Sequence, residues 1–401
     1  MIELDSRQTI IVAILVLFLG KFLNKRINIL RRYNIPEPVT GGLLASLFFG
    51  LIFFVFDFDI KFSTHYRDIL LIIFFTAIGL STEFRSIIKG GKTLLIITVF
   101  AIVYIFIQNS IGIAIAQLFH FDQGLGMLVG SIPLQGGHGN VVSFVPVIDQ
   151  HFNAPNSMEI GMIMATFGLI IGGVLGGPVA KYLIKKHQLK SNDSEEDTNI
   201  TIGAKHGENP TIDYSSILIV TLMLFISIGV GIYLHKLLDQ INFTLPLFAT
   251  CMLGGVLIAN LIPYIVPKLK CASKSPTLAI ASELSLGLFL AMAMMALKFW
   301  EIGEESVFII VSILVQTIFI LIFSVFVMFR VLGKDYGAAV ISAGYIGSAM
   351  GATPTAMANM AAVTKTHGPS PIAFAVIPIL GAFIIQVSNA FVINIIIMIL
   401  N

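Results

Sequence analysis

The sequence predicts an all-α polytopic membrane protein built from two inverted five-span repeats, each with a re-entrant, broken helical hairpin. Of the 401 residues, 56% are hydrophobic and only 11% are charged, and the mean hydropathy is +0.93. Soluble domains carry roughly 25% charged residues, so the composition excludes an ordinary soluble protein. The apolar runs are about 18 residues or longer, which is typical of membrane helices and not of barrel strands. The repeats and the hairpins are predicted from the order of these runs and from the charges between them.

Twelve apolar runs follow one another along the chain. Two of them, 125–146 and 337–361, are interrupted near their middles by glycine, proline and polar residues, and we expect each to enter and leave the membrane on one side. The other ten runs are the predicted spans, at residues 8–24, 36–56, 68–82, 93–118, 160–183, 214–235, 244–266, 277–297, 306–329 and 371–400.

Basic residues divide unevenly between the loops of this ten-span arrangement. Nineteen of the 24 lysines and arginines fall on the side that holds the loops after the odd-numbered spans. The other side holds only Arg7, Lys61, Arg67, Lys236 and Lys298. Because basic loops remain in the cytoplasm, we expect both termini outside and the central loop inside.

The polar stretch 186–213 divides the chain into two halves, 1–185 and 214–401, that resemble each other. FFTAIGLSTEF at 74–84 matches LFLAMAMMALKF at 288–299. In the interrupted runs, Gly130 and Gly137 match Gly344 and Gly351 at a spacing of 214. Each half holds five predicted spans, an odd number, so the second copy must be inverted relative to the first. Many secondary transporters follow this plan, with broken helices that meet near the midplane of the membrane.

The two interrupted runs form the predicted binding site. The first contains GSIPLQGGHGNVVSFVP, in which Pro133 and the glycines favour a broken helix, and the second contains GYIGSAMGATPTAMANM. We expect Pro354 in the first turn of a half-helix that Thr353 caps. The free N–H groups of such a half-helix suit a carboxylate, while unwound carbonyls and hydroxyls suit sodium. The alternative is that the glycines only allow helices to cross closely.

Polar and glycine residues beside the two breaks are the candidate ligands. Substrate contacts are predicted for Ser131, Gln135, Gly136, Gly137, His138, Gly139, Asn140, Gly351, Ala352, Thr353, Pro354, Thr355 and Asn359. Sodium contacts are predicted for Asn109 in the fourth span and for Gln386 and Asn389 in the last. Two alternatives stay open: His138 could carry a proton or only pin the loop, and the amides and hydroxyls could serve helix-to-helix hydrogen bonds.

With these residues in place, the chain resembles the bacterial sodium/glutamate symporter family along nearly its whole length. Seven ordered stretches carry the resemblance: IPEPVTGGL at 35–43, FFTAIGL at 74–80, QNSIGI at 108–113, GGHG at 136–139, GGPVAKYL at 176–183, LGLFLAMAMMALKFWE at 286–301 and GATPTAMANM at 351–360. The resemblance implies sodium-coupled uptake of glutamate across the bacterial cytoplasmic membrane. It also implies ten spans in two inverted repeats, a homodimer, and re-entrant loops that carry the glycine motifs, with sodium as coupling ion and no cofactor.

Two positions depart from the pattern of that family. Asn140 follows the GGHG motif, where the family usually continues with threonine, so the preferred substrate is left open. Gln386 stands where many relatives carry an acidic residue, so the number of coupled sodium ions is left open too.

Other functions agree with the sequence less well than sodium-coupled glutamate transport, or equally well in one case. A sodium-coupled carrier of another organic anion or amino acid differs only in the residues that line the site. A channel is disfavoured because the chain lacks a repeated filter or a row of charges. An enzyme is disfavoured because no HExxH motif and no pair of carboxylates lies at the span centres. A net charge of +2 without a basic stripe also excludes nucleic acid as a partner.

Overall fold

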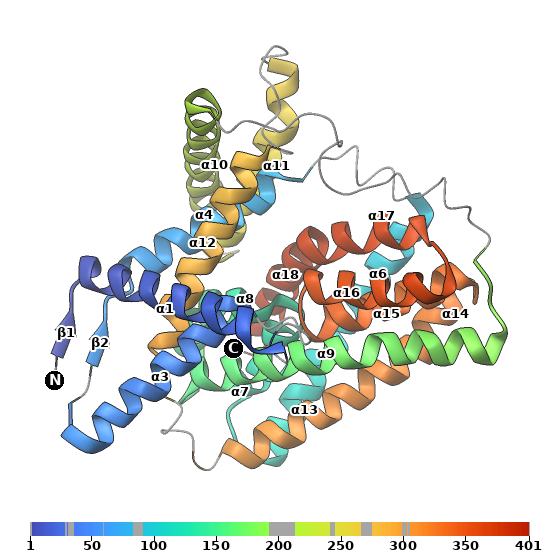
Figure 1. Cartoon of the computed structure of the whole chain (residues 1–401), viewed down its shortest axis with the longest axis horizontal. Helices are drawn as coiled ribbons and strands as arrows, with labels where there is room; N and C mark the ends of the chain where they lie inside the picture. The colour runs from blue at the N-terminus through green and yellow to red at the C-terminus, as the bar shows by residue number, and fades with distance from the viewer. Residues whose placement is uncertain are drawn as a thin grey trace. The chain divides into compact units, whose positions relative to one another are not determined.

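The computed structural model describes residues 2–28, 30, 36–58, 60–82, 91–191, 213–240, 245–265, 275–298, 303 and 305–400. These residues are almost entirely helical (Figure 1). The first half of the chain contains α1 (Ser6–Arg26), α3 (Glu37–Phe56), α4 (His65–Leu80), α6 (Gly91–Leu118), α7 (Gln123–Leu128), α8 (Ser131–His151) and α9 (Ser157–His187). The second half contains α10 (Tyr214–Gln240), α11 (Leu247–Ile265), α12 (Pro276–Met295), α13 (Glu305–Ile322), the π-helix η4 (Phe323–Met328), α14 (Phe329–Val331), α15 (Tyr336–Met350), α16 (Thr353–His367), α17 (Pro371–Ile379), the π-helix η5 (Leu380–Ile384) and α18 (Ile385–Leu400).

Eight helical segments within the described ranges are long and apolar enough to cross a membrane. They are α1, α3, α6, α9, α10, α12, Glu305–Val331 and Pro371–Leu400. This confirms the prediction of a helical polytopic membrane protein, with eight candidate spans where the sequence predicted ten. The other two predicted spans, 68–82 and 244–266, correspond to α4, of 16 residues, and to α11, whose apolar stretch is Leu247–Pro263. A helix of 16 residues is about 24 Å long, shorter than a hydrocarbon core of about 30 Å.

A short pair of strands was not expected from the sequence. The strands β1 (Ile2–Leu4) and β2 (Ile60–Phe62) form a short parallel ladder, in which Ile2 pairs with Ile60. Strands this short are below the length at which residue alternation can be detected in a sequence.

The predicted linker 186–213 lies mostly outside the described residues, apart from the end of α9, the residues up to Ser191, and Asp213.

The chain forms two compact units, and each unit takes helices from both halves of the sequence. Unit 1 comprises Met1–Phe84, Val142–Val147 and Pro210–Gly303, and so contains α1, α3, α4, α10, α11 and α12. Unit 2 comprises Arg85–Val141, Ile148–Asn209 and Glu304–Asn401, and so contains the whole second interrupted segment and the first one as far as Val141. Every candidate ligand therefore belongs to unit 2.

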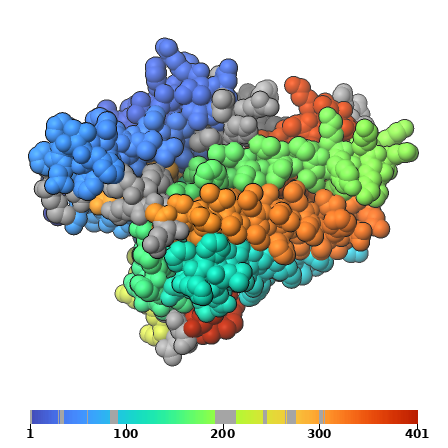
Figure 2. Space-filling view, turned by 90° about the horizontal axis from the view of Figure 1, so that it is seen from below, coloured from blue at the N-terminus to red at the C-terminus, as the bar shows by residue number. Residues whose placement is uncertain are grey.

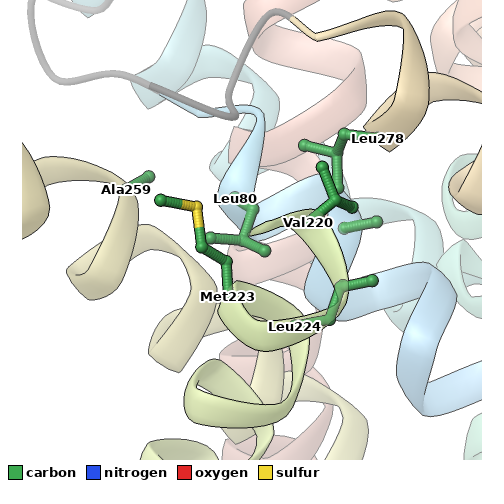
Figure 3. Close-up of a cluster of buried hydrophobic side chains, with 7 residues drawn as sticks. Leu80, Val220, Met223, Leu224, Ala259 and Leu278 are labelled. Atoms are coloured by element: carbon green, nitrogen blue, oxygen red, sulfur yellow. The ribbon is translucent and has the colours of Figure 1, made fainter. Parts of the chain in front are cut away.

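Among the described residues of unit 1, apolar side chains are buried in two clusters. One cluster joins α4, α10 and α11 with the start of α12 (Figure 3); its buried members are Ala77, Leu80, Val220, Met223, Leu224, Ala259 and Leu278. The other joins α12, α1 and α3; its buried members are Ala13, Val16, Ala45, Ala291, Met292 and Met295. Because lipid tails are as apolar as these side chains, van der Waals packing between the helices holds such clusters together within a membrane.

Helix crossings in unit 1 recur at matching positions of the two halves. A Cβ placed on Gly41 of α3 would lie 2.1 Å from the carbonyl oxygen of Val16 in α1. A Cβ on Gly254 of α11 would lie 2.4 Å from the carbonyl oxygen of Ser227 in α10. These backbones approach so closely that only glycine fits at both crossings.

In unit 2, α9 runs alongside α15 and α16 (Figure 1). Figure 2 shows α13, in orange, lying next to α9, in green. Close packing against α9 depends on glycines one helical turn apart, because Gly168 and Gly172 both contact Met350. This packing fixes the end of α15 against a long straight helix.

Candidate functional site

The second interrupted segment, α15 and α16, is a helical hairpin that turns at Gly351 and Ala352; we call it hairpin 2. A Cβ on Gly347 would lie 2.6 Å from Cα of Ala356, and one on Gly344 would lie 2.7 Å from Sδ of Met360. Residues equally far before and after the turn are therefore neighbours, which is the arrangement of two antiparallel helices. The predicted break at the GATPT motif is thus correct, although the helices extend beyond 337–361.

At the start of α16, the prediction for Pro354 is confirmed and the prediction for Thr353 is wrong. Pro354 occupies the first turn of the helix, where its missing N–H costs nothing. The expectation that Thr353 caps the helix is wrong: Ala352 is the N-cap, and no side chain caps α16. Ala352 has extended backbone and Thr353 is already helical, so the helix begins one residue earlier than the threonine signal suggests.

The first interrupted segment, α7 and α8, is also a hairpin, and we call it hairpin 1. A Cβ on Gly124 would lie 3.0 Å from Cγ2 of Ile148, so the two ends of the segment are neighbours. Gly137 has φ 66° and ψ −166°, a conformation that is nearly restricted to glycine, and it divides α8 into two helical segments. Pro133, expected to break the helix, lies instead in the first turn of α8, where proline is tolerated.

The tips of the two hairpins meet. A Cβ on Gly137 would lie 3.6 Å from the carbonyl oxygen of Gly351. A helical segment starts just after each tip, at His138 in α8 and at Thr353 in α16. First-turn N–H groups lack partners within the helix and give that end about half a positive charge. The structure therefore places two such ends beside each other, which suits a carboxylate.

Several polar atoms near the tips are buried without a hydrogen-bond partner among the described residues. Asn140 is 0% exposed, and neither its Nδ2 nor its Oδ1 has a partner. The hydroxyl of Thr355 and the Oε1 atom of Gln135 are in the same state. An unsatisfied buried polar group costs about 1–3 kcal/mol, so a ligand that pairs with these atoms recovers that energy on binding.

Ser348 is a candidate that the sequence analysis did not single out. It lies one turn before Gly351, it is buried, and its hydroxyl has no partner. A Cβ on Gly381 of η5 would lie 3.1 Å from the hydroxyl of Ser348 and 2.7 Å from that of Thr353. A hydroxyl one turn before a glycine break is the signal that could have identified it.

Ser131, Asn109 and Asn389 form one hydrogen-bond network that joins the start of α8 to α6 and α18. The Ser131 N–H donates to Oδ1 of Asn109 at 3.1 Å, and Nδ2 of Asn109 donates to the Ser131 hydroxyl at 2.7 Å. That hydroxyl donates to Oδ1 of Asn389, and Nδ2 of Asn389 donates to the Ser131 carbonyl at 3.2 Å. The geometry matches helix-to-helix bonding, so a sodium ion here would have to share oxygens that already accept hydrogen bonds.

His138 bonds to α9. Its Nε2 lies 3.0 Å from the hydroxyl of Thr166, which itself donates to the carbonyl of Met162 at 2.9 Å. The one hydroxyl proton of Thr166 is used on Met162, so His138 donates through Nε2 and is the Nε2–H tautomer. This bond holds the start of the second segment of α8 against α9.

Asn359 and Gln386 occupy different surroundings from the tips. Nδ2 of Asn359 donates to the Gly172 carbonyl at 2.8 Å, which ties α16 to α9, two turns away from Gly351. Gln386 lies one helical turn before Asn389 on α18, and its Oε1 is buried without a partner.

In the part of the chain that the structure describes, no cluster of three His, Cys, Asp or Glu side chains could hold a metal, so neutral oxygens are the available sodium ligands.

Comparison with known proteins agrees with the resemblance seen in the motifs. The family model described as "Sodium/glutamate symporter" matches residues 2–369. The chain is 37% identical over 399 residues to the sodium/glutamate symporter of Escherichia coli (strain K12), covering 99% of this chain and 98% of that protein. The sodium/glutamate symporter of Haemophilus influenzae is 36% identical over 392 residues, covering 96% and 95%.

The family match over most of the chain and the relatives above 30% identity at full length indicate the same family. The multi-pass helical structure agrees with that family, and the matched region contains both hairpins. The chain therefore belongs to the sodium/glutamate symporter family, a family of membrane transporters and not of enzymes.

Proposed function

We propose that this chain carries glutamate into the cell together with sodium, by alternating access. One observation carries the proposal: the tips of the two hairpins meet at Gly137 and Gly351, and a helical segment begins just after each tip, at His138 and at Thr353. Glutamate has carboxylates that suit helix N-termini and a net charge of about −1 near neutral pH. The relatives that match over full length are named as sodium/glutamate symporters, which supports the same substrate and ion.

The substrate site of this proposal consists of the residues around the tips. Main-chain N–H groups after Gly137 and after Ala352 face a carboxylate, and the unpartnered side chains of Asn140 and Thr355 pair with the rest of the substrate. Ser348 and Thr353 add hydroxyls on the side of η5. The remaining predicted residues, Ser131, Gln135, Gly136, His138, Gly139, Pro354 and Asn359, shape the two tips and hold them in place.

The sodium site of this proposal includes Gln386. Its buried and unpartnered Oε1 is a hard oxygen ligand of the kind that sodium prefers. Asn109 and Asn389 contribute side-chain oxygens through their hydrogen-bond network with Ser131. Asn389 lies one helical turn after Gln386 on α18. Sodium bound there would hold the start of α8 against α6 and α18, and so fix the segment that leads to the tip of hairpin 1.

The wider architecture that we propose is two inverted five-span repeats in a homodimer, within the bacterial cytoplasmic membrane. The matching glycine crossings of unit 1, at Gly41 and Gly254, support the repeats. The bias of basic residues supports external termini and a cytoplasmic central loop. Labelling of single cysteines in intact cells tests this: a cysteine replacing Lys205 is expected to react only after the membrane is opened.

Uptake into proteoliposomes of the purified protein tests the function. We expect labelled glutamate to accumulate when sodium is imposed outside and to stop accumulating when potassium replaces it. Competition by aspartate, citrate and neutral amino acids separates glutamate from the nearest alternative, a sodium-coupled carrier of another organic anion or amino acid. Accumulation that ignores sodium would contradict the coupling, and full competition by citrate would favour the alternative.

A further inference from the structure

Gln108 of α6 bonds to both hairpins with a single side-chain amide. Its Nε2 donates to the carbonyl of Ala349 at 3.2 Å, and its Oε1 accepts from Nε2 of Gln135 at 2.8 Å. Ala349 is two residues before Gly351, the tip of hairpin 2. Gln135 is likewise two residues before Gly137, the tip of hairpin 1. The amide thus joins the two backbone segments that lead into the tips.

The main chain of Gln108 is held as well. Nε2 of Gln316, on α13, donates to the Gln108 carbonyl at 2.8 Å and to the Val129 carbonyl at 3.2 Å. Val129 is the residue that follows α7, so this bond satisfies a carbonyl at the gap between α7 and α8. Gln108, Gln135 and Gln316 are all buried. The position of the amide is therefore set by bonds on both its side chain and its backbone.

Packing of α6 against its neighbours does not by itself require that one amide group bond to two different hairpins. The last carbonyls of a helix have no partner within it, and Gln108 supplies one for α15. The donor and the acceptor of one amide group are rigidly connected, and here each serves a different hairpin. When one tip moves, the amide keeps both bonds only if the other tip moves with it. Loss of either bond leaves a buried polar group unsatisfied, which is costly.

We propose that Gln108 is a positioning residue that couples the two hairpin tips and so makes glutamate affinity depend on sodium. This rests on the proposed function, because the coupled ligands are those of the symport cycle. Coupling between two ligands requires an element whose position both ligands change. Gln108 touches neither ligand; it transmits the position of hairpin 1, beside the proposed sodium site, to the end of α15.

Binding of glutamate at low and high sodium tests this proposal on the purified full-length protein. The variants are Gln108→Met and Gln135→Met, which keep side-chain length and remove the amide, and the double variant. Gln117→Met is the matched control, since Gln117 is an exposed glutamine on the same helix. We expect Gln108→Met to raise the glutamate Kd at saturating sodium about tenfold. We also expect it to reduce the sodium dependence of that Kd by at least about threefold.

The double variant distinguishes coupling from general damage. Both single changes break the same bond, so the Kd of the double variant should lie within about twofold of that of Gln108→Met. The proposal would be overturned if the effects of the two single changes on the glutamate Kd multiply in the double variant. It would also be overturned if the sodium dependence of Kd in Gln108→Met equals that of the unchanged protein. If Gln108→Met does not fold, Gln108→Asn keeps an amide that is too short to reach both partners, and the same changes are expected.

Failure of the proposed function gives a different result. If the unchanged protein binds glutamate equally well at low and high sodium, symport itself is contradicted. The link that Gln108 makes between the two hairpin tips is then judged by the glutamate Kd alone. If the effects of the two single changes on Kd do not multiply in the double variant, they support the link; if they multiply, they overturn it.

Discussion

Gly137 and Gly351, which are 214 positions apart in the chain, face each other at the tips of two helical hairpins. The gap is small: a Cβ on Gly137 would lie 3.6 Å from the Gly351 carbonyl oxygen, an ordinary van der Waals contact. Gly137 therefore has room for a side chain and is required for its backbone instead, since φ 66° with ψ −166° is nearly restricted to glycine.

Replacing Gly137 by alanine is expected to impair binding more than folding. The strained backbone costs about 1–3 kcal/mol, which the tip can relieve by moving away from Gly351. We expect the glutamate KM in sodium-driven uptake to rise at least about tenfold, with little change in Tm. Gly229→Ala is the control, because a Cβ on that glycine of α10 meets nothing within 4 Å. Equal uptake by both variants would show that the conformation of Gly137 is not needed.

Removing the unpartnered side chains at the tips should separate stability from affinity. Asn140→Ala and Thr355→Val delete buried polar atoms that have no partner in the structure. Since each such group costs about 1–3 kcal/mol, Tm without ligand should stay equal or rise. Glutamate affinity should fall about tenfold or more in each. A fall in Tm with unchanged affinity would mean that these groups are structural.

Two adjacent glycines on α9 provide a matched test of the packing behind hairpin 2. A Cβ on Gly176 would lie 2.2 Å from Nδ2 of Asn359, whereas one on Gly177 meets nothing within 4 Å. Gly176→Ala should lower the free energy of unfolding and Tm, because it displaces the amide that ties α16 to α9. Gly177→Ala should raise stability by about 1 kcal/mol through helix propensity. Thermal unfolding in detergent compares the two, and equal Tm values would contradict the close approach.

The electrical behaviour of transport reports the number of sodium ions. Glutamate with one sodium moves no net charge, and each further sodium adds about 2.3 kcal/mol per 100 mV of membrane potential. A tenfold sodium gradient is worth only roughly 1.4 kcal/mol, so at least two ions per glutamate are favoured. We expect an inside-negative potential to speed uptake in proteoliposomes. Rates that do not respond to potential would contradict this count.

Gln386 is expected to contribute to the sodium site and not to substrate recognition. Gln386→Ala removes a buried oxygen that has no partner among the described residues. The sodium concentration for half-maximal uptake should rise about tenfold, while glutamate KM at saturating sodium should change little. Asn260→Ala on α11 is a control amide whose bonds, to Thr82 and Val256, lie within unit 1. A rise in glutamate KM alone would place Gln386 at the substrate instead.

Much of the fold was predictable from sequence because it depends on local signals. Apolar runs located the helices, and glycine with proline located both breaks, at Gly137 and at Gly351. The cap of α16 was predicted wrongly at Thr353 because two non-helical residues before it, Gly351 and Ala352, form a tight turn between helices, which a cap signal does not describe. Roles that depend on distant partners were not predictable, as with Gln108, whose two partners are 27 and 241 positions away.

The bonding state of the candidate residues was also beyond the sequence. Ser131 and Asn389 are 258 positions apart, and nothing local indicates that their side chains satisfy each other. Asn140 and Asn359 are the same residue type, and each follows a glycine break, yet one amide has no partner among the described residues and the other ties two helices together. Only the packed structure separates a side chain available to a ligand from one already used.

A density map of the protein with glutamate and sodium bound tests the central claim most directly. We expect density for a carboxylate between the tips, within hydrogen-bond distance, about 2.7–3.2 Å, of main-chain nitrogens after Gly137 and after Ala352. Asn140 and Thr355 should then have partners. Glutamate density away from both tips, or tips that stand apart with the ligand bound, would contradict the account.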